Sequence, residues 1–313
     1  MERIARCFLL PIDGTDESIK SIHFLKHLYY PEHTGLTLIL SYFVPPLPPI
    51  YSEASLSRET ARKKKELIKA QKQRAHDVFD QARRSLVQAG FADENIQEHV
   101  QERAMSVARH ACRLADIKRV DAVLIQKRIT SSLEGFLKSD QTDALIRHCA
   151  VSPLWFTEGN IDPSQAAVCI QSEDASLRAV DHAAFMLAET ETRINILHVS
   201  RSASSAVSCP AFVLAPELLQ WLETDAGEEI MPFLMESREI LKSAGIAEDR
   251  VRMTILPLKG KTASTILSYC REESTGIIVL GHSLPEGIWG FLKTSVTKQI
   301  LADFKDMAVW VSQ

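Results

Sequence analysis

The feature that most restricts the fold of this chain is an internal repeat with a constant spacing. The segment LVQAGFADENI (residues 86–96) resembles LKSAGIAEDRV (residues 241–251), and EGFLKSDQT (residues 134–142) resembles WGFLKTSVT (residues 289–297). Each pair is separated by 155 positions without a gap. Because independent segments share one spacing, we infer that the chain contains two copies of one structural unit.

The limits of the two copies follow from a third pair of segments. IDGTDESIKSIHFL (residues 12–25) resembles IQSEDASLRAVDHA (residues 170–183) at a spacing of 158 positions, so one copy carries a small insertion or deletion in its middle. Between the copies, EGNIDPSQ (residues 158–165) is rich in turn-forming residues and is typical of a linker. We therefore predict one domain over residues 1–158 and a second over residues 165–313.

Each copy has the pattern of strands that alternate with helices. Short apolar runs, rich in β-branched and aliphatic residues, predict five strands per copy. They lie at 6–12, 36–43, 96–101, 122–126 and 153–157, and again at 166–171, 193–199, 251–256, 277–281 and 308–312. Segments between them have helical spacing, and Gly90 and Gly245 are well placed to end two long helices. The predicted fold class is α/β, with a doubly wound parallel sheet in each domain and ligands at the carboxyl ends of the strands.

Three motifs resemble those of the universal stress protein family. GHSLPEGIWGFLKTSVTKQIL (residues 281–301) is similar to the family's glycine-containing loop and the helix after it, while IDGTDES (residues 12–18) and ILHVS (residues 196–200) are similar to the ends of its first two strands. The resemblance covers both copies, as in tandem members of the family. It implies two domains of the adenine nucleotide alpha-hydrolase-like type that form an intrachain pseudo-dimer, equivalent to the dimer of single-domain members.

The same resemblance implies where an adenine nucleotide would bind. In nucleotide-binding members, glycines let the backbone approach the phosphates, and N–H groups at the start of the next helix hold the anion. Two of the three family glycines are replaced in the second copy, by Leu284 and Thr294. The nucleotide-binding residues that the resemblance implies in this copy are Gly281, Ser295 and Val296, with Gly287 and Gly290 inside the loop at a different spacing.

The first copy has kept a different part of this site. Pro11 and Asp13 match the family's P-x-D at the end of the first strand, where the carboxylate contacts the nucleoside, whereas Gln171 takes the Asp position in the second copy. The loop of the first copy has no glycine at the family positions, and Asp140 would repel a phosphate. We therefore predict that the phosphate site of the first copy is inactive. Ordinary roles stay open for Ser295, as a helix N-cap, and for Asp13, in a turn.

These motifs predict a stress-response regulatory or binding protein with degenerate adenine-nucleotide sites. The second domain is expected to retain binding of ATP or AMP, with Mg²⁺ accompanying the nucleotide. One competing hypothesis is an interaction scaffold that binds no nucleotide and presents its long helices and the Pro-rich segment VPPLPPI (residues 44–50) to another protein. A slow ATP hydrolase or phosphotransfer enzyme is a second, and a relative of electron-transfer flavoprotein subunits is a third. No catalytic constellation accompanies His198, so we expect no enzymatic activity.

Composition restricts the partners and the compartment. A net charge of −4 provides no global positive field, so we expect neither nucleic acid nor an anionic membrane as a partner. The run RKKK (residues 62–65) has acids interspersed after it, which predicts a solvated helix face. The apolar run at residues 7–12 is too short for a signal peptide or a membrane span, which favours the cytoplasm. Six scattered cysteines predict reduced thiols and no metal site. A protein partner and a homodimer of tandem chains stay open.

Overall fold

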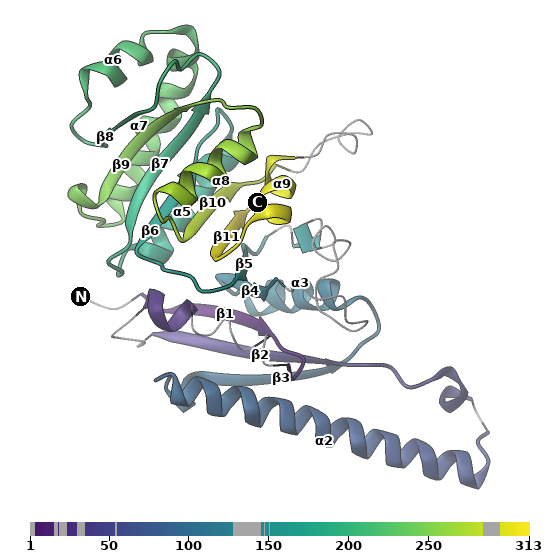
Figure 1. The fold of residues 1–313 in the computed structure, drawn as a ribbon. Coiled ribbons are helices and arrows are strands. Elements are labelled where there is room, and N and C mark those ends of the chain that lie inside the picture. Colours follow the sequence, from purple (N-terminus) through teal and green to yellow (C-terminus); the bar gives the residue numbers. More distant parts are fainter. Residues whose placement is uncertain are drawn as a thin grey trace. The chain divides into compact units, whose positions relative to one another are not determined.

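The computed structural model describes residues 4–15, 18, 24–29, 35–53, 55–127, 145–146, 148–149, 151–283 and 295–313 (Figure 1). These residues form two compact units. The first unit contains the described residues up to Cys149, except a short stretch at 27–29. That stretch belongs to the second unit, together with the described residues from Val151 onward.

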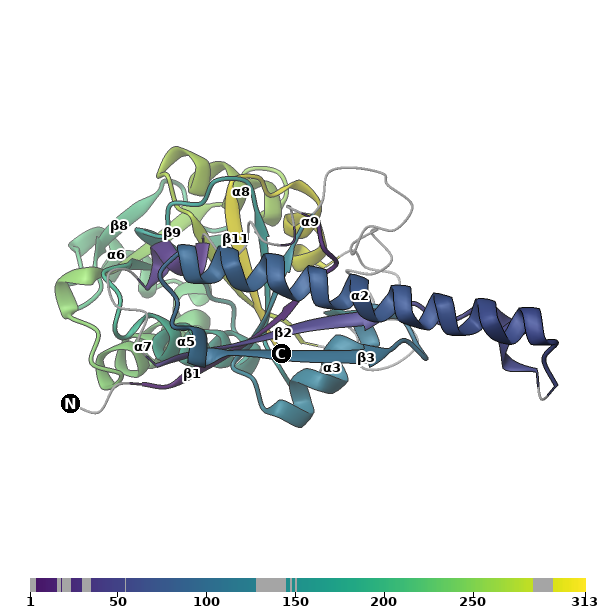
Figure 2. The same cartoon turned by 90° about the horizontal axis from the view of Figure 1, so that it is seen from below.

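The first unit contains four parallel strands in the order β3-β2-β1-β4. They are β1 (Arg6–Pro11), β2 (Leu36–Val44), β3 (Ile96–Glu102) and β4 (Ala122–Gln126). The helices α2 (Arg58–Gln88) and α3 (Val107–Lys118) lie on opposite faces of these strands, as Figure 1 shows. The short 3-10 helix η1 (Pro49–Ser52) precedes α2, and Figure 2 shows the N-terminal half of α2 extending past the strands of this unit. A second 3-10 turn, η2 (Asp93–Asn95), leads into β3.

The second unit repeats this arrangement and adds to it at both edges. Its strand order is β5-β11-β10-β6-β7-β9-β8. The five parallel strands are β6 (Gln165–Cys169), β7 (Arg193–Ser200), β9 (Val251–Pro257), β10 (Ile277–Gly281) and β11 (Met307–Ser312). Two antiparallel strands flank them, β5 (Leu154–Glu158) beside β11 and β8 (Val207–Pro210) beside β9. The helices are α5 (Asp174–Leu187), α6 (Pro216–Leu222), α7 (Asp225–Ser243), α8 (Thr262–Glu272) and α9 (Val296–Asp303), with a 3-10 turn η3 (Glu248–Arg250) before β9.

The predicted α/β fold with two doubly wound domains is confirmed, and all ten predicted strands are present within two residues of their expected limits. Gly90 and Gly245 follow α2 and α7 with left-handed backbones, at φ values of +98° and +80°. Sequence reasoning missed β8, because VSCP is a short, proline-containing segment without strand alternation, and it also missed α6. Among the described residues, no helix combines the length and apolar character that crossing a bilayer requires.

The last strand of each repeat meets the other inside the second unit. Trp155 of β5 lies directly opposite Trp310 of β11, and their rings stack with centroids 3.7 Å apart. Both side chains are fully buried. The Nε1 atom of Trp155 donates a hydrogen bond of 2.9 Å to Nε2 of His182, on α5. Since the two tryptophans occupy the same position in their repeats, this contact joins equivalent points of the two copies.

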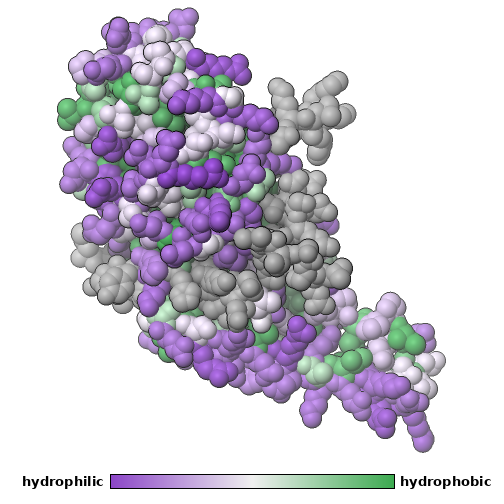
Figure 3. Space-filling model, in the orientation of Figure 1, coloured by the Kyte–Doolittle hydropathy of each residue, from purple (hydrophilic) through white to green (hydrophobic). Residues whose placement is uncertain are grey.

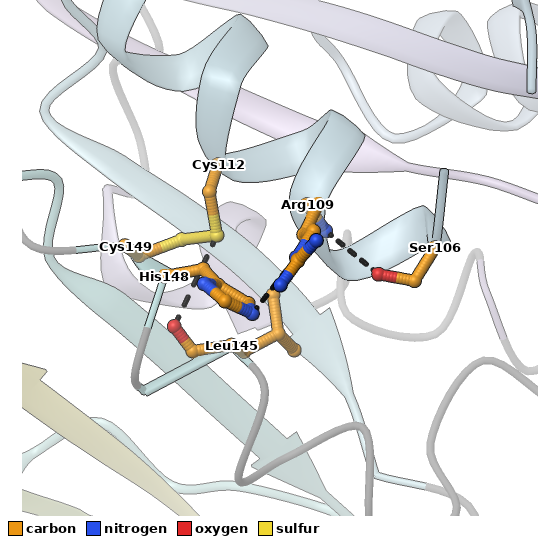
Figure 4. The surroundings of a disulfide bond; sticks show 6 residues. All are labelled: Ser106, Arg109, Cys112, Leu145, His148 and Cys149. Carbon is orange, nitrogen blue, oxygen red and sulfur yellow. Dashed lines mark hydrogen bonds between the residues drawn. A yellow bond between two sulfur atoms is a disulfide. The ribbon is translucent and has the colours of Figure 1, made fainter. Parts of the chain in front are cut away.

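A disulfide in the first unit links Cys112 of α3 to Cys149 (Figure 4). Both cysteines are buried. Next to the bond, Nε of Arg109 donates to Nε2 of His148 at 3.0 Å, as Figure 4 shows. The expectation that all cysteines are reduced thiols is therefore wrong for this pair. The two residues are 37 positions apart, and no local pattern indicates that they meet. The other four cysteines are free thiols.

Candidate functional site

The carboxyl ends of the parallel strands in the second unit form the edge at which a ligand is expected. His198, near the end of β7, lies beside the end of β6, with its Nδ1 atom 2.9 Å from the carbonyl oxygen of Ile170. A carbonyl only accepts, so Nδ1 carries the hydrogen and donates it. Burial lowers the pKa of His198 below its usual value, against smaller opposing effects of this bond and of Glu229. The imidazole is therefore neutral near pH 7 and holds two strand ends together.

Gly281 ends β10 where this strand passes very close to the first turn of α5. A Cβ atom at this position would collide with the backbone of Ala175. The glycine is thus required by the packing of a helix against a strand, whether or not a ligand approaches it. The next residue is held in place by a hydrogen bond, because the His282 N–H donates to the carbonyl oxygen of Ser312 on β11 at 2.7 Å.

Charged side chains surround the start of the loop after β10. The hydroxyl of Ser283 donates to Oε2 of Glu173, which precedes α5, at 3.1 Å. Burial lowers the pKa of His282, the charge of Lys298 lowers it further, and Glu173 opposes both effects. The described residues at the start of this loop therefore include the Glu173 carboxylate and the Lys298 ammonium near a neutral His282 imidazole.

Ser295 is the N-cap of α9, the ordinary role that the sequence left open for it, because its Oγ atom accepts a hydrogen bond of 3.2 Å from the Lys298 N–H. Val296 is the first residue of this helix. Gly287, Gly290, Leu284 and Thr294 lie outside the described residues, as do Asp140 and the rest of the loop in the first repeat. The structure thus describes the strand end before the second loop and the helix start after it.

In the first unit, the candidate residues at the end of β1 have local partners. Oδ1 of Asp13 accepts hydrogen bonds from both the N–H and the hydroxyl of Thr15, at 3.1 and 2.8 Å. Gly14, with φ +82°, makes the left-handed turn between them. Pro11 is buried at the end of β1, opposite Ser41 of β2. The turn that the Asp-Gly pair predicted is present, and it uses the Asp13 carboxylate.

The structure brings Gly281 and Ser295 into one unit and leaves Pro11 and Asp13 in the other. Sequence reasoning missed Glu173, Ser283 and Lys298. Aligning the repeats places Glu173 at the position of Thr15, the residue that bonds Asp13 in the first copy, and this could have drawn attention to Glu173. Lys298 could have been found from its place in the first turn after the Ser295 cap, where a cation reaches an anion bound at the helix start.

Comparison with known proteins gives a consistent result. A family model described as the universal stress protein family matches residues 6–155 and again residues 165–309. The universal stress protein YxiE of Bacillus subtilis (strain 168) is 26% identical over 135 residues, which are 42% of this chain and 88% of that protein. A solved universal stress protein from Archaeoglobus fulgidus DSM 4304 is similar with a TM-score of 0.62 at 14% identity, over 99% of this chain and 97% of that one. A functionally unknown protein, PA1789 from Pseudomonas aeruginosa PAO1, has a TM-score of 0.53 at 11% identity, over 98% and 92%.

Proposed function

Since the chain belongs to the universal stress protein family, we propose that it is a stress-response regulatory or binding protein whose second repeat binds an adenine nucleotide such as ATP or AMP. The first repeat, in this proposal, has lost its phosphate site. Residues 1–158 and 165–313 are the two domains, the cytoplasm is their compartment, and their pseudo-dimer is the working unit.

The observation that carries the nucleotide proposal is the start of α9. The first N–H groups of a helix have no acceptor within it and carry partial positive charge. Ser295 uses one of them, that of Lys298. The N–H groups of Val296 and Thr297 precede it in the same first turn and suit an anion such as a phosphate. The Lys298 ammonium adds a full positive charge to this end of the helix.

The carboxylate of Glu173 limits how much negative charge the proposed site can accept. Its carboxylate, bonded to Ser283, stands beside the loop and disfavours a triphosphate more than a monophosphate. Mg²⁺ bound to the nucleotide would reduce this repulsion. In the first repeat, Asp13 already bonds Thr15, which supports the proposal that this copy has lost nucleotide binding.

Titration calorimetry of the full chain with ATP and with AMP, each in the presence of Mg²⁺, tests the proposal. Ser295→Asp keeps a good N-cap but adds a negative charge at the proposed anion site, so Kd should rise at least about tenfold. Ser106→Asp is the matched control, because Ser106 caps α3 in the first unit in the same way, accepting from the Arg109 N–H. This control should leave Kd unchanged. Absence of saturable binding by the wild type would favour the interaction scaffold instead.

A further inference from the structure

The strand β3 lies at one edge of the first unit's sheet. In the part of the chain that the structure describes, β3 pairs only with β2. The N–H of Arg103, just beyond β3, donates to the carbonyl oxygen of Val44 on β2. Because N–H and C=O groups alternate in direction along a strand, the even-numbered residues Glu98, Val100 and Glu102 point theirs away from β2. They form a row of backbone donors and acceptors at an open edge.

The second repeat shows what this edge can accept. Its equivalent strand is β9, 155 positions later, and β8 pairs antiparallel with it. Val207 lies opposite Ile255, and the Ala211 N–H donates to the carbonyl oxygen of Val251. On β9, which β8 covers, Ile255 is 0% exposed, whereas Val100, its counterpart in the first repeat, is 55% exposed. Figure 1 shows β8 beside β9 in the second unit, while β3 is the outermost strand of the first. One copy therefore fills this edge from its own chain, whereas no described residue of the other copy pairs with it.

A groove of about 820 Å³ runs beside the open edge, between β3, α2 and η1. Its wall includes Leu47, Ile68, Phe79 and Val100, so it can take apolar side chains. The groove is braced by two hydrogen bonds from α2, of 2.7 Å from Lys64 Nζ to the Tyr51 carbonyl and of 2.8 Å from Gln71 Nε2 to the Pro45 carbonyl. Figure 3 shows that the surface of the first unit is mainly hydrophilic along α2, with an apolar patch near the N-terminal end of this helix.

The charges on β3 decide the kind of partner. Glu98 and Glu102 line the groove from β3, which contains no Lys or Arg, and Lys64 and Lys72 line it from α2. Arg83 of α2 bonds Glu98 at 2.9 Å and also donates to the Ile96 carbonyl, the group that β8 binds in the other copy. Glu102 lies at the other end of the row of outward-pointing residues on β3. A second β3 would place glutamates opposite or diagonal to one another, which destabilises a pair of strands.

We propose that the edge of β3 docks an extended segment of a partner protein, which adds antiparallel to β3 and carries an apolar residue opposite Val100 and basic residues two positions away on each side. The apolar residue fills the groove against Phe79, and one basic residue meets Glu102. Backbone hydrogen bonds to Glu98, Val100 and Glu102 supply the rest of the recognition. This interaction is independent of the proposed nucleotide site, which lies in the other unit.

A fluorescein-labelled peptide with the core Lys-Thr-Val-Thr-Lys is the probe, and fluorescence anisotropy of the full chain is the readout. Val100→Pro removes one outward N–H without touching the bonds to β2, so this variant should bind the peptide at least tenfold more weakly. Val100→Thr keeps the N–H and the β-branched shape and should stay within about threefold of the wild type. Circular dichroism melting checks that both variants are folded.

Charge reversal gives a second test that does not depend on the proline variant folding. A peptide with the core Glu-Thr-Val-Thr-Glu should bind the wild type at least tenfold more weakly than the lysine peptide. In Glu102→Lys, the ratio of the two peptides' Kd values should be at least tenfold smaller than in the wild type. Equal binding by Val100→Pro and wild type would overturn the proposal, as would absence of saturable binding of the lysine peptide. Sedimentation of the chain alone that shows a dimer abolished by Val100→Pro would assign the edge to a second copy and likewise overturn it.

Discussion

His182 makes the second unit sensitive to acid in a way that can be calculated from the structure. Its Nε2 atom accepts from Trp155 Nε1 at 2.9 Å, so the ring must be neutral for this bond to exist. Burial lowers the pKa of His182 to about 3, from an ordinary value of 6.5. In the unfolded chain the same ring takes up a proton as the pH falls below 6.5. The stability that comes from this group is therefore complete above pH 6.5 and is lost progressively as the pH falls toward 3.

The size of the effect follows from the two pKa values. Each pKa unit corresponds to about 1.4 kcal/mol, so the full loss below pH 3 is about 5 kcal/mol. Between pH 7 and pH 5 the expected loss is about 2 kcal/mol. His182→Gln places an amide oxygen where Nε2 accepts and removes the titrating group. The variant should be less stable at pH 7 because its packing changes, and its stability should depend less on pH than that of the wild type.

Urea unfolding followed by tryptophan fluorescence at pH 7, 6 and 5 measures this difference. All four tryptophans lie in the sequence after residue 150, so the signal reports the second unit. The control is His76→Gln, which removes a histidine of α2 in the first unit, outside the unit that the tryptophans report, so the fluorescence transition should keep the wild-type pH dependence. If the free energy of unfolding of His182→Gln fell between pH 7 and 5 as steeply as that of the wild type, burial of a neutral His182 would be refuted.

Four further outcomes are expected. Thiol titration of the unreduced, denatured chain should find four thiols, and a count of six would contradict the disulfide. Cys112→Ser should lower the free energy of unfolding by about 3–4 kcal/mol, because the disulfide closes a loop between cysteines 37 positions apart. Gly281→Ala should destabilise the second unit by about 1–3 kcal/mol in urea unfolding, because its methyl group meets the Ala175 backbone; an unchanged midpoint would be inconsistent with that contact. Glu173→Gln should tighten ATP binding by a larger factor than AMP binding in calorimetry, since ATP carries more negative charge near this carboxylate; equal factors would place the phosphates elsewhere.

Part of the candidate site could be read from residue patterns and part could not. The Ser295 cap and the Asp13-Gly14 turn depend on a few consecutive residues, so the sequence offered both as alternatives to ligand binding. The place of Gly281 at a strand end was also predicted, but its reason was not. That glycine is required by Ala175, more than a hundred positions away, and such a contact leaves no trace in the neighbouring residues.

By itself, the sequence determined that the chain is two copies of an α/β unit, where their strands lie and which family they belong to. Repeats, periodic apolar residues and glycine stops can be read from the order of the residues without any knowledge of which side chains touch. Only the tertiary structure decided that β8 covers β9 while no other described residue pairs with the outer edge of β3, that Cys112 meets Cys149, and that Trp155 stacks on Trp310 beside a neutral His182. These pairings join segments distant in the chain, and their energies come from burial and geometry that exist only once the strands are assembled.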